Sequence, residues 1–121
     1  MNIKLLKGDF SVCQLQDLSK LNLAADVFFL TKTPDELSLV CLTDEVPPNT
    51  VKTDHGWRAF KVEGQLDFSL VGILSNLAKV LAERSISIFA VSSYDTDYIL
   101  IKAVKVDEAK EALAAAGYEL L

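Results

Sequence analysis

A strand followed by an amphipathic helix, early in the second half of the chain, restricts the fold more than any other feature. Residues 57–63 alternate apolar and polar side chains, and this period of two is typical of a half-buried strand. Between Asp67 and Arg84 the apolar residues recur every three or four positions, as one buried helix face requires. Either Asp67 or Ser69 can cap the start of this helix. Together these two segments indicate a layered α+β domain.

The rest of this half supplies the other elements of a small sheet with two helices. The apolar segments 86–92 and 98–101 predict two strands joined by an acidic turn. A second helix is expected to begin at Asp107 and to end before Gly117, a C-cap glycine, and residues 118–121 predict a last short strand. The order strand–helix–strand–strand–helix–strand is the ferredoxin-like split βαβ motif, in which two helices cover one face of a four-stranded sheet.

The first half of the chain is a compressed version of the same pattern. Strands are predicted at residues 10–15, 27–30, 37–42 and 50–53. Residues 17–23 form at most a short helix. Residues 28–40 match residues 89–101 as strand, acidic turn and strand, at an offset that places Glu36 opposite Asp97. We therefore expect two tandem ferredoxin-like halves, of which the first is compressed.

Length and charge fit this division and exclude several function classes. The 121 residues are 50% hydrophobic and 24% charged, which is enough to build a core shared by halves at residues 1–56 and 57–121. A net charge of −5, with scattered Lys and Arg, disfavours nucleic acids and anionic membrane surfaces as partners. The charged N-terminus does not resemble a signal peptide, and no stretch is apolar enough to span a membrane, so we expect a cytoplasmic location.

Residue types that carry enzyme chemistry are few. Cys13 and Cys41 lie in apolar strand-like segments and are expected to be buried thiols, while His55 reads as a solvated linker residue. The sequence has no metal-ligand spacing, phosphate loop or nucleophile motif, so we expect no metal, no cofactor and no catalytic residue. Asp95 and Asp97 are one carboxylate pair that acid–base chemistry could use, but no substrate-binding signal accompanies them.

Two blocks of the sequence, residues 62–74 and 88–100, resemble the ACT domain. Residues 29–38 resemble the N-terminal half of the small stand-alone tandem-ACT proteins of bacteria, which are similar to the ACT repeats of the CASTOR arginine sensors. The resemblance covers nearly the whole chain. It implies a regulatory module that binds an amino acid or another small effector in the loop entering the first helix, and ACT units that pair side by side, as in a homodimer. The chain departs from the family at Arg84-Ser85, where a glycine is common.

The start of the first helix is the first expected ligand site. Gly72 falls in the predicted first turn, where a glycine costs about 1 kcal/mol relative to alanine, and close approach of a ligand to the backbone would compensate. The N–H groups of Leu70, Val71 and Gly72, flanked by Ser69 and Ile73, would bind a carboxylate at the positive end of the helix dipole. The alternatives are that Gly72 only allows close helix packing and that Ser69 only caps the helix.

The acidic turn is the second expected site, at Tyr94, Thr96 and Asp97. The CASTOR-like pattern implies that Thr96 and Asp97 approach the polar or cationic end of the ligand. Asp97 would then favour arginine or lysine, because a carboxylate forms two charge-assisted hydrogen bonds with a guanidinium. The plainer alternative is that these residues only form the turn.

Two non-enzymatic functions remain open. The first is an effector-binding regulatory module, and the second is a module that has lost its ligand and only dimerises or docks on an unidentified protein target. The second is supported by the unpaired edges of an open four-stranded sheet, which two copies can join.

Overall fold

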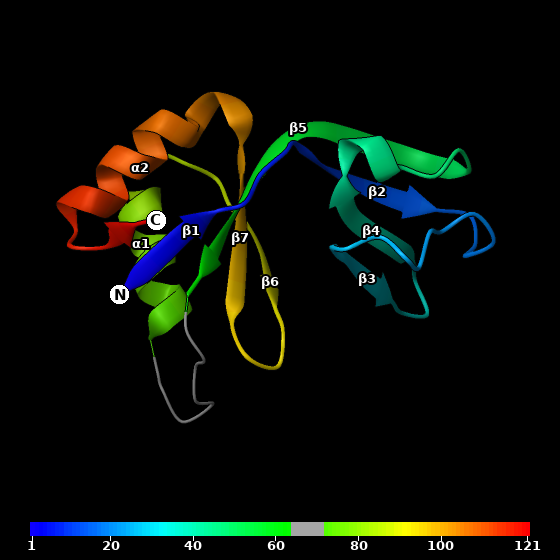
Figure 1. Ribbon diagram of the computed structural model, residues 1–121, viewed down its shortest axis with the longest axis horizontal. Helices are drawn as coiled ribbons and strands as arrows, with labels where there is room; N and C mark the ends of the chain where they lie inside the picture. Colours follow the sequence, from blue (N-terminus) through cyan, green and yellow to red (C-terminus); the bar gives the residue numbers. More distant parts are fainter. Residues whose placement is uncertain (64–71) are drawn as a thin grey trace. The chain divides into compact units, whose positions relative to one another are not determined.

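Figure 1 shows a computed structural model of the chain, in which residues 1–63 and 72–121 are described. The chain divides into two compact units, one of Gly8–Trp57 and one that combines Met1–Lys7 with Arg58–Leu121. We call them the N-terminal unit and the C-terminal unit. The sequence analysis grouped residues 1–7 with the first half, whereas they belong to the C-terminal unit in the structure. The N-terminal unit is thus an insertion after the first strand of the C-terminal unit.

The C-terminal unit contains a sheet with the strand order β6-β7-β5-β1-β8. Its strands are β1 (Asn2–Leu5), the last residues of β5 (Thr50–Val62), β6 (Phe89–Ser92), β7 (Asp97–Lys102) and β8 (Glu119–Leu120). Strand β1 pairs antiparallel with β5 and parallel with β8, so Ile3 lies opposite both Val62 and Leu120. A strand that the sequence analysis did not anticipate therefore separates the first and last strands of the expected motif.

Two helices cover one face of this sheet (Figure 1), α1 (Ile73–Ala82) and α2 (Val106–Ala115). A short 3-10 helix, η2 (Ala103–Lys105), precedes α2. Both helices and strands β1, β5 and β7 contribute to one core: Ile3, Phe60, Val62, Leu77, Leu81, Ile99, Ile101, Ala109 and Leu113. The expected α+β class, and the order of helices and strands from β5 to β8, are confirmed.

The sequence predicted the end of α2 correctly but not the start of α1. Gly117 follows α2 with a φ of 97°, and its N–H donates to the carbonyl of Ala114, as expected for a C-cap glycine. The predicted start of the first helix is wrong. Helix α1 begins at Ile73, and its N-cap is Gly72, whose φ of 79° is left-handed. Residues 64–71 lie outside the described residues.

The N-terminal unit is an antiparallel sheet with the strand order β3-β4-β2-β5. Its elements are β2 (Phe10–Leu15), β3 (Phe28–Lys32), β4 (Leu37–Leu42), the 3-10 helix η1 (Thr43–Glu45) and residues 50–57 of β5. In the C-terminal unit, when β1 is left out, the order β6-β7-β5-β8 corresponds strand for strand to this order. Residues 8–57, all of which are described, contain no α-helix.

The short helix expected at residues 17–23 is wrong. The carboxylate of Asp17 accepts hydrogen bonds from the N–H of Ser19 at 2.9 Å and from its hydroxyl at 2.5 Å. Such local bonds compete with the hydrogen bonds of a helix. The segment also has little apolar surface to bury, since Leu21 packs on the core but Leu23 is exposed. It therefore forms an irregular loop.

Strand β5 joins two segments that the sequence analysis kept apart, residues 50–53 and 57–63. They form one strand, Thr50–Val62, because a β-bulge against β2 absorbs the residues between them. Gly56 has a φ of 84° within this bulge, a conformation that glycine adopts without strain. Gly56 is therefore a strand residue.

His55 lies in this strand and not in a linker. It is exposed, and its Nδ1 lies 2.7 Å from the hydroxyl of Ser11, which is fully buried. The hydroxyl of Thr43 also lies 2.9 Å from that of Ser11. The buried hydroxyl of Ser11 thus has two partners, and His55 has a structural contact.

The core of the N-terminal unit contains both cysteines. Cys13, Leu15, Leu39 and Cys41 form a buried cluster on one face of the sheet. Both thiols are free, as expected from the sequence. Burial raises the pKa of both, that of Cys41 to about 12, so neither is a reactive thiolate at neutral pH.

The two units repeat one hairpin closely. Strands β4 and β7 have the same burial pattern, three consecutive buried residues flanked by half-buried ones, and each is followed directly by a 3-10 helix. In the turns, the N–H of Thr33 donates to the carbonyl of Glu36 at 3.0 Å, and the N–H of Ser93 donates to that of Thr96 at 2.8 Å. Glu36 is therefore equivalent to Thr96, and the sequence alignment that set it opposite Asp97 was wrong by one residue.

Candidate functional site

The expected ligand site at the start of α1 is described only in part. Ser69, Leu70 and Val71 lie outside the described residues. Gly72 is exposed and caps the helix without a side-chain hydrogen bond to its first turn. The outward-pointing N–H groups therefore begin at Ile73, later than predicted. The side chain of Ile73 is half-buried and packs against the core.

Thr96, a residue of the second expected site, anchors the β6–β7 turn. Thr96 is only 5% exposed, and its hydroxyl donates a hydrogen bond to the carbonyl of Val62 at 2.6 Å. Its own carbonyl accepts the N–H and the hydroxyl of Ser93. The turn is thereby tied to the end of β5, where the segment leading to α1 begins.

The side chains of Thr96 and Asp97 do not converge on one group. Asp97 accepts a hydrogen bond from the hydroxyl of Ser92 at 2.6 Å, across the β6–β7 pair. Its carboxylate has further acceptor sites for a ligand. Tyr94, at the tip of the turn, is 78% exposed. Asp97 is thus the charged residue that the sequence analysis proposed for contact with a ligand, whereas Thr96 fixes the backbone of the turn.

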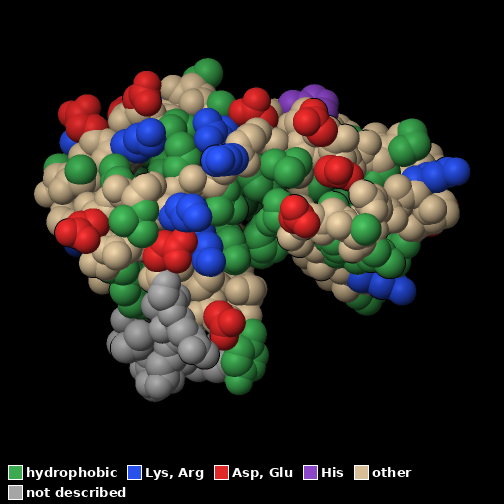
Figure 2. Space-filling model, in the orientation of Figure 1, with side chains coloured by type: hydrophobic (Ala, Val, Ile, Leu, Met, Phe, Trp, Pro, Cys, Tyr) green, Lys and Arg blue, Asp and Glu red, His purple; other side chains and the backbone are tan. Residues whose placement is uncertain are grey.

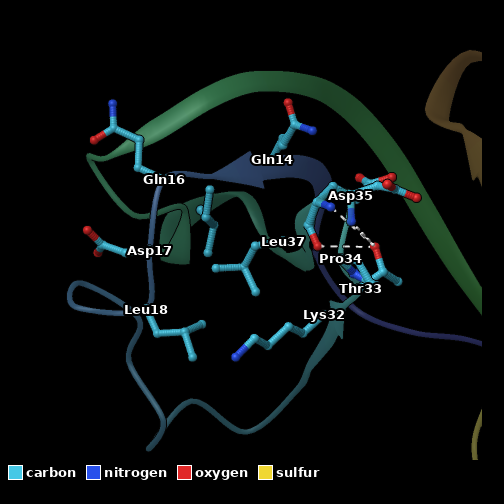
Figure 3. A pocket seen from close by; sticks show the side chains of 11 residues that line it. Gln14, Gln16, Asp17, Leu18, Lys32, Thr33, Pro34, Asp35 and Leu37 are labelled. Atoms are coloured by element: carbon cyan, nitrogen blue, oxygen red, sulfur yellow. Dashed lines mark hydrogen bonds between the residues drawn. The ribbon is translucent and has the colours of Figure 1, made fainter.

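An open pocket of about 550 Å³ lies in the N-terminal unit, and the sequence analysis missed it (Figure 3). It is lined by residues 14–18 at the end of β2 and by residues 32–37 around the β3–β4 turn. This turn is the counterpart of the β6–β7 turn. The match of residues 28–40 to residues 89–101 was therefore the sequence signal that could have indicated the pocket.

The pocket has an apolar base and a charged rim. Leu15, which is 4% exposed, and Leu37 belong to the apolar cluster, and Leu37 projects toward the middle of the pocket in Figure 3. Lys32 extends along one side of the pocket. Among the described residues its side-chain amine makes no hydrogen bond or ion pair. Such a mixture of aliphatic surface and a few charged groups is typical of small-molecule sites.

The acidic rim is held by local hydrogen bonds. The hydroxyl of Thr33 accepts the N–H groups of Asp35 and Glu36, both at 3.2 Å. Asp17 accepts hydrogen bonds from Ser19 and from the side-chain amide of Asn49, the latter at 3.0 Å. These bonds lower the pKa of Asp17 below its ordinary value. Asp17 is therefore ionised at neutral pH.

The described residues form no other cluster of charged side chains that suggests a site. Figure 2 shows Lys and Arg interspersed with Asp and Glu on the visible face. Within residues 1–63 and 72–121, no group of three His, Cys, Asp or Glu side chains is placed to hold a metal ion. None of the described helices is long and apolar enough to cross a membrane.

Comparison with known proteins identifies the fold. The family model of the ACT domain matches residues 52–115, more than half of the chain. The chain belongs to the ACT-domain family. A second model, described as an N-terminal domain, matches residues 8–49 and thus most of the inserted unit. Among curated proteins, none matches this sequence.

Several solved structures are similar to this ACT-domain protein. An Agobacterium tumefaciens protein is 31% identical with a TM-score of 0.87, over 99% of this chain and 91% of that one. A Vibrio cholerae protein of unknown function, described as a possible transport protein, is 21% identical with a TM-score of 0.73, over 94% and 88%. The ligand-free regulatory subunit of aspartate kinase from Thermus thermophilus shares the fold at 12% identity and a TM-score of 0.67, over 97% and 98%.

Proposed function

We propose that this ACT-domain protein is a non-catalytic regulatory module that binds a small effector, an amino acid, at the loop entering α1. The observation that carries the proposal is the match of the ACT-domain model to residues 52–115, which include this loop. The fold shared with a regulatory subunit of aspartate kinase is consistent with it.

The contacts around the site support binding of an amino acid. Among the described residues, no side chain caps the first-turn N–H groups that follow Gly72, so these groups and the helix dipole can receive the ligand's carboxylate. The hydrogen bond from Thr96 to Val62 fixes the neighbouring turn. Asp97 then serves the cationic end of the ligand, which favours arginine or lysine over acidic amino acids.

The N-terminal unit is proposed to be a second, helix-poor ACT-like unit, which makes the chain a tandem protein like the ACT repeats of the CASTOR sensors. Its strand order and its turn hydrogen bonds repeat those of the C-terminal unit. In the N-terminal unit the irregular loop 16–27 takes the place of the first helix. The 3-10 helix η1 follows β4 in this unit, as η2 and α2 follow β7 in the C-terminal unit.

Edge strands favour a second candidate function, assembly without a ligand. Among the described residues, β6 pairs only with β7, and β8 pairs only with β1. Such edges can receive a strand of a second copy, which would give a homodimer, or of another protein. Analytical ultracentrifugation with and without amino acids separates assembly that needs a ligand from assembly that does not.

A thermal-shift screen against the twenty amino acids tests the main proposal. A ligand at a hundred times its dissociation constant adds about 2.7 kcal/mol of stability, which raises the melting temperature by several degrees in a chain of this size. We expect a basic amino acid to be among the hits. Calorimetric titration of Asp97→Asn should then show weaker binding, whereas Asp107→Asn, an exposed position on α2, should bind normally. A flat screen contradicts effector binding and favours assembly.

A further inference from the structure

The pocket of the N-terminal unit exists because no helix covers that part of the sheet. In the C-terminal unit, Leu77 and Leu81 of α1 are fully buried against the strands. In the N-terminal unit the chain leaves β2 as an irregular loop, which Asp17 fixes through Ser19 and Asn49. The apolar base of the pocket is therefore open to a ligand where a helix would otherwise lie.

Lys32 is placed to bind an anionic group in this pocket. It is the last residue of β3 and pairs with Leu37 of β4, so its side chain leaves the sheet beside the aliphatic base. Figure 3 shows its amine directed along the pocket toward Leu18. Among the described residues no carboxylate neutralises it, so a ligand carboxylate would meet an available ammonium group.

The balance of charge limits what this ammonium can bind. Three carboxylates line the same pocket, those of Asp17, Asp35 and Glu36, against the single Lys32. A phosphate or a dicarboxylate would bring more negative charge than the one cation offsets. A zwitterion satisfies both signs, because its ammonium group can face the acidic rim while its carboxylate meets Lys32.

We propose that the N-terminal unit has its own binding site for a small zwitterion with an aliphatic body, such as an aliphatic α-amino acid. The carboxylate binds Lys32, the ammonium group binds the acidic rim at Asp35 and Glu36, and the aliphatic part packs on Leu15 and Leu37. This site is separate from the one proposed at α1. Its ligand preference differs, because its aliphatic base favours an aliphatic side chain and its cation, Lys32, binds the ligand's carboxylate.

Titration of the full-length protein with L-leucine, followed by the backbone amide signals in two-dimensional NMR, tests this site. We expect saturable shifts confined to residues 14–18 and 32–37. Lys32→Met keeps the aliphatic stem and should weaken binding about tenfold or more, because a hydrogen bond to a charged group is lost. Lys52→Met removes an exposed lysine of the same unit outside the pocket and should bind as the wild type does.

Matched ligands and a second variant separate the two proposed sites. 4-Methylpentanoate lacks the ammonium group and isoamylamine lacks the carboxylate, so each should bind more weakly than leucine. Asp97→Asn should leave the shifts of residues 14–18 and 32–37 unchanged, even if it abolishes binding near α1. The proposal is overturned if leucine shifts none of these residues, or if Lys32→Met binds leucine as tightly as the wild type.

Discussion

At the scale of single residues, hydroxyl groups hold the two turns that border the candidate sites. Thr33 supports the β3–β4 turn through the N–H groups that follow it, and Ser93 occupies the equivalent place in the β6–β7 turn. Thr96 goes further, since its buried hydroxyl reaches a carbonyl at the end of β5. These residues position the backbone, whereas their neighbours Asp97 and Lys32 carry the charged groups that we propose for ligand binding.

Thr96→Val should destabilise the protein by about 1–3 kcal/mol, because it removes a hydrogen bond in a buried environment while keeping the shape of the side chain. Urea unfolding followed by circular dichroism measures the loss. Thr96→Ser retains the hydroxyl and should recover most of the stability. Unchanged stability in Thr96→Val would contradict a contribution from this hydrogen bond.

Cys41 should make the protein less stable at alkaline pH. The pKa of this thiol rises from an ordinary 9.0 to about 12 on folding, mainly through burial. As pH rises above 9, the unfolded chain loses the thiol proton while the folded protein retains it, so the free energy of unfolding falls between about pH 9 and 12. Urea unfolding measured from neutral pH to about pH 10.5 should show a weaker decline in Cys41→Ala. Parallel curves for the two proteins would contradict this assignment.

At the scale of elements, left-handed glycines set where several segments end or bend. Gly72 begins α1, Gly117 ends α2 and Gly56 lies in the bulge of β5. Gly72 matters most, because it decides which N–H groups the helix presents. An alanine Cβ there would have room, with the amide nitrogen of Asn76 nearest at 3.8 Å, so any cost comes from the backbone conformation.

Gly72→Ala should therefore cost about 1–2 kcal/mol through backbone strain alone. Gly72→Asn should cost less than half of this, because asparagine tolerates the left-handed conformation. Chemical unfolding compares the two variants directly. If they are equally destabilised, the strain is not the cause. If both fold well but lose effector binding, Gly72 is needed for close approach of the ligand.

At the scale of the whole molecule, the N-terminal strand belongs to the unit formed by the C-terminal half of the chain. Strand β1 supplies Ile3, which is 1% exposed, to the core shared with α1 and α2. It also provides the pairing partner of both β5 and β8. The C-terminal ACT unit is thus completed by residues that precede the N-terminal unit in the sequence.

Ile3→Ala should destabilise the C-terminal unit by about 2–4 kcal/mol, through lost burial and the cavity left behind. Amide hydrogen exchange should show reduced protection in β7 and α2, and a smaller effect in β2 and β4. Leu121→Ala, at a position that is 64% exposed, should change little. Equal loss of protection in both units would mean that they unfold as one.

Local pattern was sufficient for most of the fold, because strand and helix periods report which face of a segment is buried. The sequence predicted the strands at residues 10–15 and 37–42, the turn between β6 and β7, and the burial of both cysteines. It also predicted the second helix, but α2 begins at Val106 and is not capped by Asp107 as expected. Tertiary structure alone decided the rest. Strand β1 is short and is defined by its partners β5 and β8, and loop 16–27 leaves a pocket that depends on a helix not forming. The pocket residues lie in segments 14–18 and 32–37, and only the pairing of β2 with β4 brings them together.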